Sequence, residues 1–104
     1  MPVIVRETWY LKDEYLNEAL RIFQEMDDIL GPEAHVQEGW SNHARFFQDH
    51  EHREIVEVFY VWASRALHDK LLAREEPLLA DFQKRYFRKA RTFEFLTELP
   101  VEVE

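Results

Sequence analysis

Five histidines are the side chains of this sequence best suited to proton transfer near neutral pH, and they stand at positions 35, 43, 50, 52 and 68. His43 lies in a segment of alternating apolar and polar residues, which predicts a strand. There it could take the proton of a phenol or hydroquinone and leave an electron-rich anion that oxygen attacks directly. The alternative is a histidine on the solvated side of that strand. On the same regular strand His35 would stand about 27 Å away, so we expect no joint action of His35 and His43 on one small molecule.

The segment His50-Glu51-His52 offers side chains that metals accept, and two histidines two residues apart on an extended segment point the same way. A polar hairpin loop contains such residues in any case, and a metal site needs further ligands and supporting contacts. We therefore predict a solvated loop and no metal site. His68, in the first turn of a predicted helix, faces either a cavity or water, and the sequence leaves both open.

Aromatic residues make up 14% of the chain, and many fall on predicted strands. Their flat apolar faces would suit a planar aromatic ligand, although residues with this spacing more often fill the interior. They include Trp9, Trp40, Trp62, Tyr10, Tyr60, Phe59, Phe93 and Phe95. We expect most of them in the core, and the phenol of Tyr60 could in addition hydrogen-bond a carbonyl group.

Two carboxylates, Glu7 and Glu57, stand among apolar residues of predicted strands. A buried carboxylate has a raised pKa and can serve as an acid or a base. The alternatives are an exposed strand edge, or an ion pair with Arg6 or Arg91.

The only basic cluster of the sequence is the run from Lys84 to Arg91. Its Arg85 or Arg91 could hold an anionic carboxylate or phenolate ligand. The alternative is that the run only offsets acidic neighbours.

The hydrophobic pattern predicts strands at 3–11, 34–47, 55–63 and 92–99, a helix at 13–30 capped by Asp13, and a helix from Ser64 to about Tyr86. Gly31-Pro32 is expected to end the first helix, Pro77 to divide the second, and Gly39 to mark a bulge that could place His35 and His43 on opposite faces. This order predicts an α+β, ferredoxin-like βαββαβ protomer, with a four-stranded antiparallel sheet and two helices on one face.

Composition limits what such a protomer can be. The 104 residues, 46% hydrophobic and 33% charged, suit a single domain over 1–104. Thirteen basic and 21 acidic residues give a formal net charge of −8, which disfavours nucleic acid and anionic membranes as partners. No cysteine, no leader pattern and no long apolar run are present, so we expect a cytoplasmic protein that does not engage a membrane.

The sheet face away from the helices is expected to be apolar, with more such surface than a monomer usually leaves in water. A second copy of the chain would cover it, which predicts a homodimer whose sheets pair into an α/β barrel. The alternative is a sheet curled enough to hide this face within a monomer.

The stretch EVFYVWASRALHDKL, from Glu57 to Leu71, resembles the antibiotic-biosynthesis-monooxygenase-like domains of the dimeric α/β-barrel superfamily. The resemblance implies a homodimeric barrel, and members include cofactor-free quinone-forming monooxygenases. It implies that Trp62 and His43 face a substrate cavity and take part in catalysis. The family's Asn four residues before the Trp is Val58 here, and its Tyr six residues after the Trp is His68.

The haem-degrading branch of the superfamily has an Asn on its first strand, a Trp within its second helix and a His about ten residues further on. Here the first strand has no Asn, and the two helix positions hold Leu71 and Asp81. The resemblance therefore disfavours haem degradation.

Two functions remain open on the sequence. The first is a monooxygenase-like enzyme that needs no cofactor and acts on a small aromatic or phenolic molecule, with His43 and Trp62 as catalytic residues. Its substrate would contact other side chains, namely Tyr60, Trp9, His68, Arg85 and Arg91. The second is a non-catalytic dimeric module that binds a small hydrophobic molecule or has a structural role.

Overall fold

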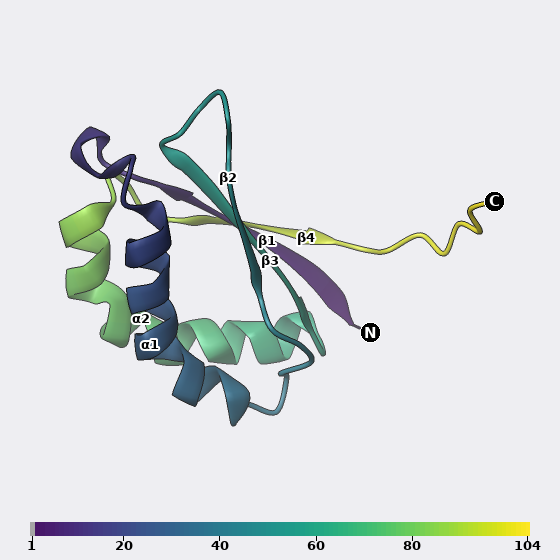
Figure 1. The fold of residues 1–104 in the computed structure, drawn as a ribbon. Helices are drawn as coiled ribbons and strands as arrows, with labels where there is room; N and C mark the ends of the chain where they lie inside the picture. The colour runs from purple at the N-terminus through teal and green to yellow at the C-terminus, as the bar shows by residue number, and fades with distance from the viewer. Residues whose placement is uncertain (1) are drawn as a thin grey trace.

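The computed structural model describes residues 2–104 and contains two long helices and four strands. The elements are β1 (Val3–Tyr10), a 3₁₀ turn (Asp13–Tyr15), α1 (Ala19–His35), β2 (Arg45–Gln48), β3 (Ile55–Trp62), α2 (Arg65–Tyr86) and β4 (Thr92–Leu96). All strand pairs are antiparallel, in the order β2-β3-β1-β4. Both helices lie against one side of the sheet, as Figure 1 shows. The predicted ferredoxin-like α+β fold is confirmed.

The two central strands expose alternate side chains to the helices and to the open face of the sheet. In β1, Val5, Glu7 and Trp9 are buried, whereas the residues between them are half-buried. Glu7 lies opposite Val58 of β3 and opposite Phe93 of β4. A carboxylate thus occupies an inward position of the central strand, where an apolar residue is usual.

The first helix differs from its prediction at both ends. Asp13 opens the short 3₁₀ turn, and α1 begins at Ala19 and continues through Gly31 and Pro32 to His35. No glycine has a positive φ in residues 2–104, so Gly31 does not form the left-handed stop that the sequence suggested. Proline's fixed φ is itself compatible with a helix.

The second predicted strand, 34–47, was too long. Its first two residues belong to α1, residues 36–44 form a connection, and only Arg45–Gln48 pairs with β3. An isolated bridge joins Trp40 to Trp62, and Gly39 lies in the connection against the Trp62 indole and not in a strand bulge. The alternation of this segment does not mark a buried face, since Val36 is 75% exposed, and a period of two in the sequence alone could not distinguish this loop from a strand.

The second helix starts as predicted, since the Ser64 hydroxyl accepts a hydrogen bond from the Leu67 amide at 3.2 Å. It is one element with Pro77 inside it, where a division into two helices was expected. Figure 1 shows that its direction changes along its length, and an internal proline is a recognised cause of such a bend. The bend lets both halves of α2 follow the twisted sheet.

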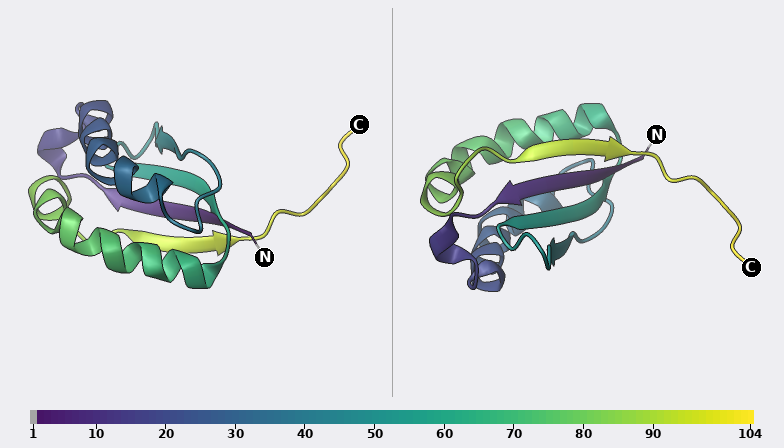
Figure 2. Two further views of the ribbon diagram at one scale, coloured as in Figure 1. Left: turned by 90° about the horizontal axis from the view of Figure 1, so that it is seen from below. Right: turned by 90° about the horizontal axis from the view of Figure 1, so that it is seen from above.

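The last strand ends at Leu96, three residues before the predicted end. The segment 97–104 extends away from the body of the protein, as both views of Figure 2 show. Its apolar residues Leu99, Val101 and Val103 are exposed. Within residues 2–104, neither helix is long and apolar enough to cross a membrane.

The core consists of two clusters on the helix side of the sheet. The larger surrounds Trp9, whose ring lies edge-on to Phe23 and Phe82. The smaller joins Val5, Trp62 and Leu71. A cavity lies where these clusters meet the connection 36–44.

The close approach of Gly39 to Trp62 yields a stability prediction. A Cβ at position 39 would overlap the buried indole, so Gly39→Ala should lower the free energy of unfolding by about 1–3 kcal/mol. Gly31→Ala is the matched control, because its Cβ would be 3.7 Å from the nearest Asp27 atom and a helical alanine is favoured, by about 0.5–1 kcal/mol. Urea denaturation followed by circular dichroism measures both. Equal effects of the two substitutions would contradict the proposed contact.

Candidate functional site

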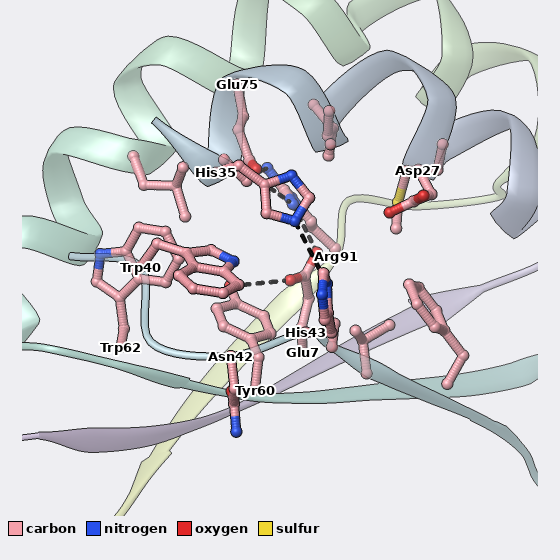
Figure 3. Close-up of a pocket in the computed structure, with 18 residues that line it drawn as sticks. Glu7, Asp27, His35, Trp40, Asn42, His43, Tyr60, Trp62, Glu75 and Arg91 are labelled. Atoms are coloured by element: carbon pink, nitrogen blue, oxygen red, sulfur yellow. Dashed lines mark hydrogen bonds and ion pairs between the residues drawn. The ribbon is translucent and has the colours of Figure 1, made fainter. Parts of the chain in front are cut away.

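A cavity of about 90 Å³ lies between the sheet and the helices. Figure 3 shows side chains from β1, β3, α1, α2 and the connection 36–44 converging on it. Its polar and aromatic lining consists of Glu7, Asp27, His35, Trp40, Asn42, His43, Phe46, Tyr60, Trp62, Glu75 and Arg91. A partly open pocket that combines flat rings with several titratable groups is typical of a small-molecule site.

The inner wall of the cavity holds a buried ion cluster. The Arg91 Nη1 lies 2.5 Å from a Glu7 oxygen, and both of its terminal nitrogens lie 3.3 Å from Glu75 Oε1. Its Nη2 also donates to the more exposed Glu76 at 2.8 Å. Among the alternatives that the sequence left open for Glu7, the ion pair with Arg91 is the one found.

Burial perturbs the acid at the centre of this cluster. Removal from water, with the nearby Glu7 charge, raises the pKa of Glu75 to about 7, and Arg91 only partly opposes this. Glu75 therefore gains or loses its proton near neutral pH, within the cavity wall.

A second hydrogen-bond chain continues from the cluster to α2. The Tyr60 hydroxyl donates to Glu7 Oε2 at 3.1 Å and lies 2.7 Å from the His68 Nε2. Since the single hydroxyl proton is given to Glu7, the short contact requires His68 to donate from Nε2. Its Nδ1 is then a buried acceptor without a partner among the described residues.

Burial and the Arg91 charge lower the pKa of His68 to about 4. Burial raises the pKa of the Tyr60 phenol, and the neighbouring Glu7 charge adds to this. Both groups are therefore neutral at pH 7. Tyr60 presents a fixed hydroxyl dipole to the cavity, and His68 holds that hydroxyl from behind.

The outer wall brings together two histidines that the sequence had separated. His35 Nε2 lies 3.3 Å from His43 Nδ1, and the Trp40 ring packs edgewise on His43, with ring centroids 5.5 Å apart. The expectation that these histidines stand about 27 Å apart on a strand is wrong. Because α1 continues to His35 and the chain then turns back, the two imidazoles meet at the cavity wall. Asn42 anchors this connection by accepting a hydrogen bond from the Val61 amide at 3.2 Å.

Of the side chains predicted to serve the site, His43, Trp62, Tyr60 and Arg91 line the cavity. His68 contacts it only through Tyr60.

Two further candidates lie outside the cavity lining. Trp9 is fully buried in the larger core cluster, and the Arg85 guanidinium lies over the Tyr86 ring at 5.3 Å.

The histidines of the hairpin connection stand in a turn. The Asp49 side chain accepts hydrogen bonds from the amides of Glu51 and His52. In the part of the chain that the structure describes, no three His, Asp or Glu side chains are grouped as metal ligands.

Glu75 is the site residue that the sequence reasoning missed. The buried face of α2 runs His68, Leu71, Glu75, Leu79, Phe82, Tyr86, with steps of three and four. Counting back four residues from Leu79 places a glutamate on the apolar face. An acid at such a position is the signal that was available, because an unpaired buried carboxylate is costly and requires a partner.

Comparisons with known proteins place the fold. No protein-family model matches this sequence. No curated protein matches it either. Among solved structures, an antibiotic biosynthesis monooxygenase superimposes with a TM-score of 0.68 at 17% identity, covering 94% of this chain and 99% of the other.

Two further solved structures give similar values. SnoaB, a cofactor-independent oxygenase from Streptomyces nogalater, has a TM-score of 0.69 at 12% identity and covers 99% and 98% of the two chains. A conserved protein from Methanosarcina mazei Go1 has a TM-score of 0.69 at 15% identity, and the match covers 95% of this chain and 94% of the other. The chain thus has the ferredoxin-like fold of these structures, in agreement with the resemblance found in its sequence.

The buried His68 predicts an acid-sensitive contribution to stability. Its folded pKa of about 4 lies below the ordinary 6.5, so the unfolded chain binds the proton more readily, and the contribution is lost as the pH falls from about 6.5 to 4. We compare the free energy of unfolding of the wild type with that of His68→Gln. The advantage of the wild type should be larger at pH 7 than at pH 4, by on the order of 3 kcal/mol.

Urea denaturation at the two pH values measures this difference. His52→Gln, in the exposed hairpin connection, is the control and should show no such pH dependence. A His68→Gln difference that is equal at pH 4 and pH 7 would refute the assignment of a neutral buried imidazole.

Proposed function

We propose that this protein is a homodimeric monooxygenase that needs no cofactor and acts on a small phenolic or hydroquinone-like molecule. The observation that carries the proposal is the cavity itself. It places the indoles of Trp40 and Trp62 beside the imidazole of His43 and the hydroxyl of Tyr60. Flat rings can hold an aromatic ring, and the polar groups can hold and move its hydroxyl proton.

In this proposal His43 removes a phenolic proton, and the imidazolium that forms stays beside the phenolate. For this role the Nδ1–H of His43 donates to the Nε2 of His35, which leaves the Nε2 of His43 as the nitrogen that accepts the phenolic proton. A ring carbon of the phenolate that bears a hydrogen gives electrons to O₂ and forms a carbon–oxygen bond, and the peroxide takes the proton back from the His43 imidazolium to become a hydroperoxide. Loss of water then leaves a carbonyl group. One oxygen atom enters the quinone, the other leaves as water, and the substrate supplies all the electrons.

The size of the cavity supports a reaction without an added organic cofactor. About 90 Å³ is small even for one ligand, so a flavin or a porphyrin would need a much larger space beside the substrate. SnoaB, a cofactor-independent oxygenase with the same fold, supports the same choice.

A binding module is the second candidate function, and Val58 favours it. This residue stands where the resembling enzymes have an Asn, and here it lines the cavity as an apolar wall. A protein of this kind would hold a phenol without oxidising it. Displacement of a bound fluorescent dye by hydroquinones, without oxygen uptake, is its expected behaviour.

The second copy in the proposal would cover the open face of the sheet. This face carries apolar residues on all four strands, namely Ile4, Ile55, Phe59, Val61, Phe47 and Leu96, of which Phe47 and Leu96 are exposed. Phe47 and Phe59 pack edgewise across the β2-β3 pair. Apolar side chains in this arrangement are typical of an interface between subunits.

Catalysis by His43 is tested by oxygen uptake with substituted hydroquinones. His43→Ala should reduce turnover by about 10²-fold or more, because general bases contribute about that much. His52→Ala, in the hairpin connection, is the control and should keep wild-type turnover. Undiminished oxygen uptake by His43→Ala would remove His43 from the mechanism, and no uptake by the wild type would favour the binding module.

The dimer is tested by native mass spectrometry. The wild type should have twice the 12.7 kDa mass of the chain, whereas Phe59→Glu should give the single-chain mass. The new carboxylate would lie opposite Arg6 and Arg45 in the strand register, so the protomer should stay folded while the apolar contact is lost. Phe59→Leu is the control that keeps the dimer. A wild type of 12.7 kDa at micromolar concentration would overturn this part of the proposal.

A further inference from the structure

The inner wall of the cavity carries more negative than positive charge. Arg91 is 7% exposed, and the two carboxylates that enclose it, Glu7 and Glu75, are 4% and 6% exposed. Two carboxylates against one guanidinium leave a formal charge of −1 in a region that water does not screen. Glu76 adds a further negative charge at the outer side of the same guanidinium.

Arg91 cannot turn to receive an anion without leaving its partners. Its Nη1 and Nη2 together contact three carboxylates. Its guanidinium carbon also lies 5.0 Å from the ring centroids of both Trp9 and Phe93. The two terminal nitrogens of Arg91 are therefore committed to protein carboxylates, and its buried Nε–H is the one donor of this guanidinium without a partner among the described residues.

Glu75 retains a free acceptor at the cavity wall. Its Oε1 takes both Arg91 contacts, whereas its Oε2 accepts none of the hydrogen bonds found within residues 2–104. The side chain is one of those that line the cavity. A ligand with a hydroxyl or amide group can donate a hydrogen bond to this oxygen. A ligand carboxylate in the same place has no proton to donate, so the two negatively charged groups would repel each other.

From these contacts we infer that Glu75 sets the charge preference of the cavity, which accepts a neutral single-ring phenol that donates a hydrogen bond and rejects the corresponding carboxylate. The inference deepens the proposed function and rests on it for the phenolic class of ligand. The ring count follows from size, because a cavity of about 150 Å³ is known to hold benzene and this one has about 90 Å³.

The test uses 4-hydroxybenzamide and 4-hydroxybenzoate, which have nearly the same shape and differ by one negative charge. Binding is measured anaerobically at pH 8 by quenching of tryptophan fluorescence, since Trp40 and Trp62 line the cavity. The wild type should bind the amide at least about tenfold more tightly than the carboxylate. Glu75→Gln, which removes the charge with little change of shape, should bring the two affinities within about threefold of each other.

Glu76→Gln is the matched control. It loses the same charge and the same kind of contact with Arg91, but its side chain is 54% exposed and water screens it. It should keep the wild-type preference. Equal affinity of the wild type for the two ligands would overturn the inference, and this measurement does not depend on any variant folding.

The ligand-binding test and the oxygen-uptake test can fail independently of each other. If oxygen uptake is absent but the amide is preferred and Glu75→Gln abolishes the preference, the charge selection holds and the oxygenase proposal fails. If oxygen uptake is present without any preference between the two ligands, the reverse is true. A Glu75→Gln variant that keeps the full preference would move charge selection away from this residue.

Discussion

The structure depends on one guanidinium held out of water by carboxylates from two different elements. Arg91 precedes β4, Glu7 lies in the middle of β1, and Glu75 lies in the middle of α2. Their contacts therefore join the sheet to the second helix. Burial of three charges costs several kcal/mol for each ion, and only close, well-oriented contacts offset it. Replacement by apolar residues of similar volume would often be at least as stable. Such a cluster is better explained by what it does to the adjoining cavity than by what it adds to stability.

The cluster determines the protonation of its neighbours. Glu7 accepts from Tyr60 and thereby directs the hydroxyl, which in turn requires His68 to donate from Nε2. The positive charge of Arg91 also helps to keep His68 neutral. The pKa values of Glu75 and His68 are therefore moved in opposite senses by one environment, burial raising that of the acid and lowering that of the base. The result is an inner wall whose hydrogen-bond acceptors and dipoles have set directions.

The fold could be predicted from the sequence because its strands and helices have clear periods, and the resemblance of residues 57–71 pointed to the same fold. The predictions failed where local signals competed with tertiary contacts. Gly31-Pro32 looks like a helix end, but the helix continues, and this continuation brings His35 to His43. Alternation in 34–47 suggested a strand, whereas close packing of Gly39 on Trp62 shapes a loop instead. Glu75 was missed because a glutamate in an amphipathic helix is usually on the solvated side.

The two faces of the sheet connect the site to the surface proposed for the second subunit. Side chains alternate between the two faces along a strand. Glu7 and Tyr60 therefore lie in the cavity wall, whereas their chain neighbours Arg6 and Phe59 lie on the open face. Arg6 is itself tied to Glu94 at 2.6 Å across the β1-β4 pair. Any contact that orders the open face must therefore order the backbone that positions Glu7 and Tyr60. For this reason a subunit interface on that face would pre-organise the cavity without contributing a single side chain to it, and a cavity of about 90 Å³ leaves little tolerance for a strand that shifts.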